Sequence, residues 1–396
     1  NPEEEVSGDK AFNYNALGSI YNLSFLLDSA IFYYQKSLMV SKKTYGQNHR
    51  MIGWINNNMA ITYYKHRLPE KAITYHKKSL NIKKDLFGDM HIETANSYNN
   101  IGSSYLDIGN YKLALKNLNI ALQVRKKYLK RNHFSIAESY INLGQVFYII
   151  EKYDSARLYY QQALEIYKAD YPDKTTSVYL DIGRTYFHQQ RYEEALNNFH
   201  IPQKEALNIP HRPISINPIM SEIYSYQGII YQRKGDYDGA LEAYHKAINY
   251  SCIGFLSSSE TNFPNAQQLL WSRNLNSLIT EKVALNKKLY ETTGKRLYLN
   301  SALSLLQVGD SVLRNTKLPY NEREQNELNE ISYSFYTELI DICFKLYENT
   351  GNDQYKELAF FYSESNKEQV MLGLLNDAVS NHTSNVPDSL LKAVEH

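Results

Sequence analysis

Cysteine is scarce in this sequence, and long hydrophobic runs are missing altogether. The only two cysteines, Cys252 and Cys343, lie far apart and have neither metal-ligand nor CxxC spacing. We interpret both as buried, reduced thiols, which favours a reducing, cytoplasmic location. No stretch approaches about eighteen consecutive apolar residues, so we expect no membrane-spanning helix. Because the sequence begins at Asn1 rather than Met, a signal peptide before that residue is an alternative that it leaves open.

An excess of one charge is also absent. Lysine and arginine number 43 against 42 aspartate and glutamate residues, which gives a net charge of +1. A polyanion-binding surface needs clustered positive charge, so nucleic acid is not the expected partner. The sequence also lacks a glycine-rich phosphate loop, a metal-binding motif and a nucleophile elbow. We therefore expect no catalytic site and no cofactor in this chain.

What the sequence does contain is a sixfold repeat. Each copy has a large residue, apolar in five of the six, followed by a small residue, an aromatic residue three positions later and an alanine nine positions after that. The small residues are Gly18, Ala60, Gly102, Gly144, Gly183 and Gly228, and the alanines are Ala30, Ala72, Ala114, Ala156, Ala195 and Ala240. Small residues let two helices approach closely, so the pattern predicts six helical hairpins over residues 11–250. The heptads of a coiled coil would not tolerate turn signals such as Gly109-Asn110 and Gly235-Asp236.

This pattern resembles the tetratricopeptide repeat (TPR) family. The spacing between small residues is 42 in the first three steps, against the usual 34, and in this it resembles the repeats of kinesin light chains. The segments that end in His49, His91 and His133 look like that family's Gly-x-x-His linker. The resemblance implies an all-α fold, a right-handed superhelix or α-solenoid. Because the three histidines lie one repeat apart, we expect each to cap the next helix rather than bind a shared metal ion.

The repeat pattern ends after Tyr250. Residues 1–10 look like an N-terminal tail, and residues 251–265, with Ser, Gly and Pro, look like a linker. The remainder, 266–396, predicts a non-repeat segment of long helices at about 266–292, 296–315, 321–349 and 353–380.

A second resemblance concerns this C-terminal segment. The runs Ala359-Phe360, Ser363–Lys367 and Val386-Pro387-Asp388 are similar to the helical stretch between TPRs and a CHAT domain, a caspase-like cysteine peptidase of bacterial proteins. A helix that begins near Pro387 would lead into that domain. The resemblance implies a CHAT domain in cis beyond His396, and neither cysteine matches its nucleophile.

In TPR hairpins the first helix of each pair lines the concave surface, and fixed offsets from the small residue give its exposed positions. They predict a peptide-binding groove lined by Asn57, Asn58, Tyr64, Asn99, Asn100, Ser103, Asn142, Gln145, Tyr148 and Arg184. Among these, Asn58, Asn100 and Asn142 recur once per repeat. Amide side chains both donate and accept hydrogen bonds, so this ladder fits the backbone of an extended peptide. The alternative is that the asparagines only satisfy backbone groups between helices.

The sequence thus favours a protein–protein interaction module that binds a peptide or protein segment. The narrower hypothesis is the sensor or docking region of a TPR-CHAT peptidase. The alternative is a stand-alone adaptor or a peptide-sensing regulator.

Overall fold

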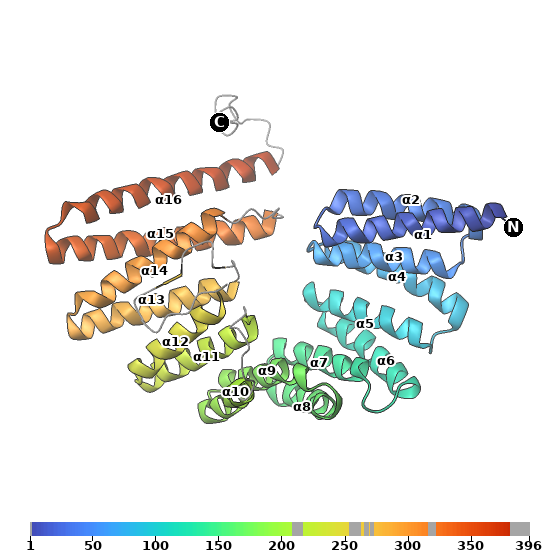
Figure 1. The fold of residues 1–396 in the computed structure, drawn as a ribbon, viewed down its shortest axis with the longest axis horizontal. Helices are drawn as coiled ribbons and strands as arrows, with labels where there is room; N and C mark the ends of the chain where they lie inside the picture. The colour runs from blue at the N-terminus through green and yellow to red at the C-terminus, as the bar shows by residue number, and fades with distance from the viewer. Residues whose placement is uncertain are drawn as a thin grey trace. The chain divides into compact units, whose positions relative to one another are not determined.

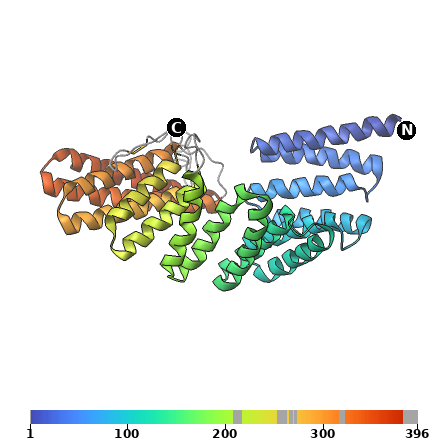
Figure 2. The ribbon, with the colours of Figure 1, turned by 60° about the horizontal axis from the view of Figure 1, so that its bottom comes forward.

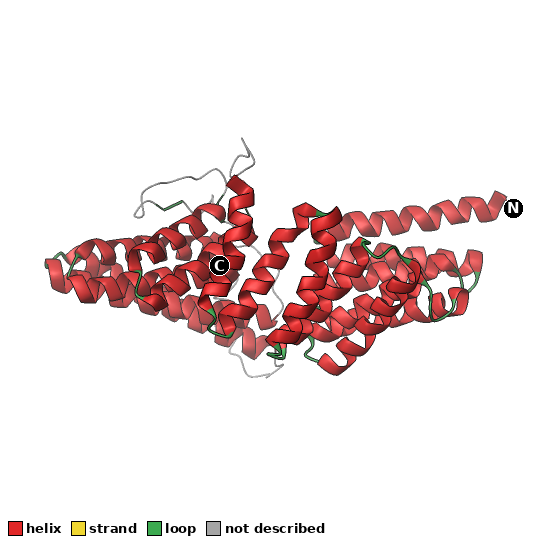
Figure 3. Cartoon of the chain, turned by 90° about the horizontal axis from the view of Figure 1, so that it is seen from below, coloured by secondary structure: helices red, strands yellow, loops and turns green. Residues whose placement is uncertain are grey.

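A computed structural model describes residues 2–207, 217–252, 263–264, 269, 273–315 and 322–380. Within these ranges the chain is almost entirely helical, as Figure 3 shows, and contains sixteen α-helices, one short 3₁₀ helix and no named strand. The described part therefore confirms the predicted all-α fold. It divides into two compact units, Asn1–Pro202 and Gln203–His396.

The first unit consists of five hairpins of antiparallel helices (Figures 1 and 2). Its helices are α1 (Pro2–Leu23), α2 (Leu27–Tyr45), α3 (Arg50–Lys65), α4 (Pro69–Phe87), α5 (Ile92–Asp107), α6 (Tyr111–Tyr128), α7 (Phe134–Ile149), α8 (Tyr153–Asp170), η1 (Pro172–Lys174), α9 (Thr175–His188) and α10 (Tyr192–Leu207). Because α1 begins at Pro2, the residues that we interpreted as a tail are helical. The acidic run after Pro2 suits this position, since Pro and negative charge both favour the first turn of a helix.

The repeated small residues explain how each hairpin closes. A Cβ atom added to Gly144 would lie 2.5 Å from the ring of Tyr160 on the second helix of the same hairpin, and Gly183 meets Phe199 in the same way. Both rings are buried. The second hairpin has Ala60 in place of glycine, and the residue at the corresponding distance along the chain is His76, a smaller ring. The partner across the hairpin is not always aromatic, since Gly102 meets Leu118 in the same place.

The histidine linkers cap the helices that follow them. The Nδ1 atoms of His49, His91 and His133 accept hydrogen bonds from the backbone N–H two residues later, at 3.3, 3.2 and 3.1 Å. This satisfies one of the free donors at each helix start. The structure thus confirms the prediction that these histidines act as caps.

The turn inside each hairpin uses a left-handed backbone conformation. Gly109 and Gly235 adopt φ values of 74° and 82°, which glycine tolerates without strain. The equivalent positions of the other hairpins hold Phe25, Arg67, Glu151 and Gln190, all with φ between 57° and 60°. The geometry of this turn is therefore conserved through the array although glycine is not.

The second unit contains the sixth hairpin together with the long C-terminal helices. Its helices are α11 (Pro218–Lys234), α12 (Tyr237–Tyr250), α13 (Arg273–Thr293), α14 (Arg296–Asn315), α15 (Glu322–Thr350) and α16 (Asp353–Ser380). One apolar core joins Tyr244 of α12 to Leu285 of α13 and Leu339 of α15. The sixth hairpin therefore packs with the non-repeat helices, whereas the sequence pattern groups it with the other five. Most of the predicted linker at 251–265 lies outside the described residues.

The boundary between the units falls inside α10, next to Pro202. Proline within a helix removes one backbone hydrogen bond and crowds the preceding turn. The repeat period also changes here, since the small residues Gly183 and Gly228 are 45 residues apart. A proline that interrupts the helix and a change in repeat length therefore coincide with the boundary.

Candidate functional site

The predicted groove residues lie on the first helices of the hairpins, α3, α5, α7 and α9. Within the first unit, α5 and α7 lie on the inner side of its bend, and α6 and α8 lie on the outer side (Figure 1). The five asparagines of the set are half-buried, so their side chains contact both protein and solvent. We call Asn57, Asn58, Asn99, Asn100 and Asn142 the asparagine face.

Two pairs on or beside this face are joined by hydrogen bonds between repeats. The Asn58 amide donates to the side-chain oxygen of Asn15 at 3.1 Å, and the Asn142 amide donates to that of Asn99 at 3.0 Å. In each pair the donor lies two residues before a small residue, and the acceptor lies three residues before the small residue of the preceding repeat. These asparagines therefore join successive repeats through their side chains, and not through the backbone groups that the alternative interpretation named.

The third pair, Asn57 and Asn100, lies between these two pairs and is not hydrogen-bonded in the described part of the chain. Asn57 and Asn100 occupy the same repeat positions as the acceptor and the donor of the two bonded pairs. No side-chain hydrogen bond joins Asn57 to Asn100 among the described contacts. Both residues are half-buried, and neither side-chain amide is sealed from solvent. The middle of the asparagine face therefore presents amide groups that can still form hydrogen bonds to a ligand.

Aromatic and charged side chains flank the asparagines. Tyr64 is exposed on α3, and burial of part of its ring and the neighbouring Asp107 carboxylate raise the pKa of its hydroxyl to about 12. Farther along, Arg184 lies 3.5 Å from Asp181 and 4.8 Å above the ring of Tyr148. At neutral pH this face thus offers a neutral phenol at one end and a cation at the other. Ser103 is half-buried and Gln145 is exposed.

Sequence reasoning missed a buried arginine behind the asparagine face. Arg125 of α6 donates to the side-chain oxygens of Asn99 and Asn96 on α5, at 3.3 and 3.0 Å. It also donates to the Ser135 carbonyl and the Ser139 hydroxyl of α7, both at 2.8 Å. Burial lowers the pKa of the guanidinium, which nonetheless remains charged. The sequence held one signal for this arginine, because the residue 42 positions earlier, Lys83, is also basic. In the structure Lys83 is buried too, and it forms a salt bridge with Glu93 at 3.3 Å.

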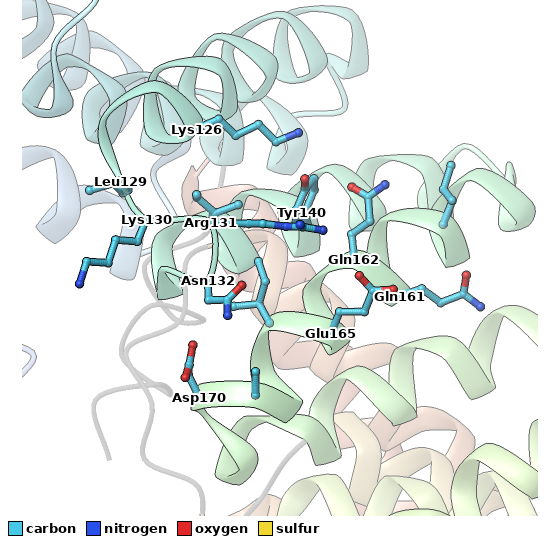
Figure 4. A pocket seen from close by; sticks show the side chains of 14 residues that line it. Lys126, Leu129, Lys130, Arg131, Asn132, Tyr140, Gln161, Gln162, Glu165 and Asp170 are labelled. Atoms are coloured by element: carbon cyan, nitrogen blue, oxygen red, sulfur yellow. The ribbon is translucent and has the colours of Figure 1, made fainter.

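A separate cleft lies elsewhere in the first unit. It has a volume of about 1180 Å³ and lies between the end of α6, the following loop, α7 and α8 (Figure 4). We call it the α6–α8 cleft. None of the ten predicted groove residues lines it.

The remaining features bear on chemistry rather than recognition. Both cysteines are buried and free, as predicted, and burial raises the thiol pKa to about 12 for Cys252 and about 11 for Cys343. Thiols with raised pKa values are poor nucleophiles. Across the described ranges no three His, Cys, Asp or Glu side chains gather as a metal site would require. No helix in those ranges is long and apolar enough to cross a membrane.

Comparison with known proteins identifies the repeats. Tetratricopeptide-repeat family models match residues 9–85, 93–169 and 221–251. The chain therefore carries tetratricopeptide repeats, which are protein–protein interaction modules, in an all-α fold. No curated protein matches the sequence.

Two solved structures with TM-scores above 0.5 share this fold, and a third is similar over half of the chain. The apo form of RapI is 16% identical with a TM-score of 0.52, over 77% of this chain and 99% of that one. A signal-transduction ATPase with a tetratricopeptide-repeat sensor, from Pyrococcus horikoshii, is 17% identical with a TM-score of 0.55, over 93% of this chain and 49% of that one. A putative kinesin light chain of Podosopora anserina is 15% identical with a TM-score of 0.45, over 51% of this chain and 99% of that one.

Proposed function

We propose that the asparagine face binds an extended segment of another polypeptide, with Asn57 and Asn100 as the main contacts. The observation that carries the proposal is the difference between the three equivalent asparagine pairs. Two of them are joined by hydrogen bonds between repeats, and the third has both amides available. A bound backbone would supply the donor and acceptor that this pair lacks.

The neighbouring side chains would set the preference for particular sequences. Tyr64 and Tyr148 add flat apolar surface, which contributes strongly at interfaces. Arg184 already contacts Tyr148 and lies near Asp181, so it is held in place before a ligand arrives. Preorganisation of this kind lowers the entropic cost of binding. Ser103 and Gln145 would add polar contacts between these two ends.

The proposal is tested by selecting random twelve-residue peptides by display against the purified chain. A selected peptide is then bound, and backbone hydrogen exchange is compared with and without it. We expect protection of α3, α5 and α7 at the positions that face the asparagines. Protection confined to the second helices α4, α6 and α8 would contradict the proposal.

A narrower proposal concerns the molecular context. The sequence resemblance at Ala359-Phe360 and Ser363–Lys367 supports a docking or sensor region for a CHAT peptidase in cis, in a reducing, cytoplasmic location. In α16 Ala359 is buried, whereas Phe360 and Phe361 are 68% and 52% exposed. Two neighbouring exposed phenylalanines on a terminal helix are compatible with a further packed element. Val386, Pro387 and Asp388 lie outside the described residues.

The gene sequence beyond the codon for His396 tests the narrower proposal. A caspase-like domain with a His-Cys pair would support it. A stop codon within a few residues would favour the stand-alone adaptor or peptide-sensing regulator.

A further inference from the structure

The α6–α8 cleft lies beside a lysine–tyrosine contact that recurs along the first unit, at the linker where a nearby residue has the opposite charge. In three successive repeats a lysine near the end of the second helix lies over a tyrosine of the next hairpin. The distances from the amine to the ring are 5.4 Å for Lys84 and Tyr98, and 5.1 Å for Lys126 and Tyr140. Lys168 and Tyr179 repeat the contact at 5.4 Å. The lysine–tyrosine pair is thus a constant feature of this side of the first unit.

The linker residue five positions after the lysine is not constant. After Lys84 it is Asp89, whose carboxylate forms a salt bridge with Lys84 at 2.8 Å. After Lys168 it is again an aspartate, Asp173, which pairs with the neighbouring Lys174 at 3.5 Å. After Lys126 it is Arg131, so the position that holds a carboxylate in the neighbouring repeats holds a second cation. Lys126 and Arg131 are both exposed, and within the described contacts neither forms a salt bridge.

The same linker also lacks two features of the two linkers before it. Gly46 and Gly88 end α2 and α4 with φ values of 80° and 84°, and the corresponding residue after α6 is Lys130. In the earlier linkers an aromatic residue stacks on the capping histidine, as in Phe87 and His91 at 4.9 Å. Leu129 replaces that aromatic residue, and it lines the cleft. The cleft therefore opens at a linker that lacks both the glycine and the stacked aromatic residue of the two linkers before it.

We propose that the α6–α8 cleft binds an acidic polypeptide segment, with one Asp or Glu carboxylate held between Lys126 and Arg131. That carboxylate takes the role that Asp89 has one repeat earlier. Apolar walls formed by Leu129, Ile136 and Leu158 accept a neighbouring apolar side chain of the same segment. This surface is separate from the asparagine face, so the proposal does not depend on the function proposed above.

The charges of the cleft favour a polypeptide over a polyanion such as nucleic acid. Figure 4 shows Lys126 and Arg131 in the upper part of the view, with Glu165 and Asp170 of α8 below them. A uniformly negative ligand would meet these two carboxylates and be repelled, whereas a peptide can place its acidic residue on the basic side only. The net charge of the whole chain, +1, also gives no general attraction for polyanions.

The test uses random twelve-residue peptides displayed on phage, selected on the chain and counter-selected on an Arg131→Asp variant. We expect the retained peptides to be enriched in Asp and Glu next to an apolar residue. One of them is synthesised with a fluorescent label, and its affinity is measured by anisotropy. Arg131→Asp should weaken binding about tenfold or more, and Arg131→Lys by no more than about threefold.

Two controls keep the result interpretable. Lys112→Asp makes the same kind of charge reversal at the opposite, exposed end of α6 and should leave the affinity unchanged. Circular dichroism melting establishes that each variant is folded. Retained peptides without acidic enrichment, an equal loss in Lys112→Asp, or displacement of the peptide by heparin at lower concentration than by unlabelled peptide would each overturn the proposal.

Discussion

Asn142 donates a hydrogen bond to the side chain of Asn99, 43 positions earlier in the chain, at 3.0 Å. This contact joins the first helices of two successive repeats, α5 and α7. It makes one asparagine of the predicted ligand-binding ladder part of the scaffold. The equivalent Asn100 has no such partner among the described contacts, so two residues of the same type and position have different roles.

This difference predicts different effects on stability. We expect Asn142→Ala to be less stable than Asn100→Ala by about 1 kcal/mol, because only the first loses a hydrogen bond between repeats. The gain in helix propensity on replacing asparagine with alanine is the same in both variants and cancels in the comparison. Urea unfolding measures both. Equal free energies of unfolding would show that the Asn99–Asn142 contact adds nothing.

The buried Arg125 is predicted to be essential to the same region. Arg125→Ala removes four hydrogen bonds to α5 and α7 and should lower the free energy of unfolding by roughly 3 kcal/mol. Arg125→Lys keeps the charge but has one donor group in place of a planar fork, so we expect it to recover less than half of the loss. Full recovery with lysine would mean that charge alone matters at this position.

The close contact between Gly144 and Tyr160 predicts a coupled pair of substitutions. Gly144→Ala should destabilise the chain by about 1 kcal/mol or more, because overpacking outweighs the gain in helix propensity. In a Tyr160→His background the same change should cost clearly less, since this pair then matches Ala60 and His76. A double-mutant cycle measured by thermal unfolding gives the coupling. An additive cycle would contradict the steric explanation.

His76 predicts a dependence of stability on pH. Burial, and to a smaller extent the charge of Lys83, lower its pKa to about 4 from the usual 6.5. Below pH 6.5 the unfolded chain takes up a proton that the folded chain does not, so stability is fully present above pH 6.5. It falls by up to about 3 kcal/mol as the pH drops toward 4.

The variant His76→Gln isolates this contribution. It should lose less stability than the wild type between pH 7.5 and pH 4.5, whatever its stability at neutral pH. The measurement is urea unfolding at several pH values across that interval. The same slope in both proteins would show that His76 is not responsible.

The sequence predicted the local geometry well because each signal is carried by residues close together in the chain. Gly109 and Gly235 mark turns, and His49, His91 and His133 precede the helices that they cap. The helices after Tyr250 were also predicted closely, since the predicted 296–315 and 353–380 match α14 and α16. The left-handed turns at Phe25, Arg67, Glu151 and Gln190 were not predictable from residue type.

The candidate site was predicted only in part. Residue offsets placed the asparagines correctly on the first helices, but they could not separate Asn142, which is hydrogen-bonded, from Asn100. That distinction depends on side-chain geometry between repeats 43 residues apart. The division of the array inside α10 was not predicted, because the repeat signature of the sixth hairpin, Gly228 with Ala240, is unchanged.

The central claim is that the middle of the asparagine face holds a polypeptide through Asn57 and Asn100. The most direct measurement is the affinity of a display-selected peptide for the wild type and for the double variant Asn57→Ala/Asn100→Ala. The control is Asn119→Ala at an exposed position of α6. We expect the double variant to bind about tenfold more weakly, at about 1 kcal/mol or less for each lost hydrogen bond, with a melting temperature no lower than that of the wild type and an unaffected control. Unchanged affinity in the double variant, or a loss of affinity that follows a loss of stability, would contradict the claim.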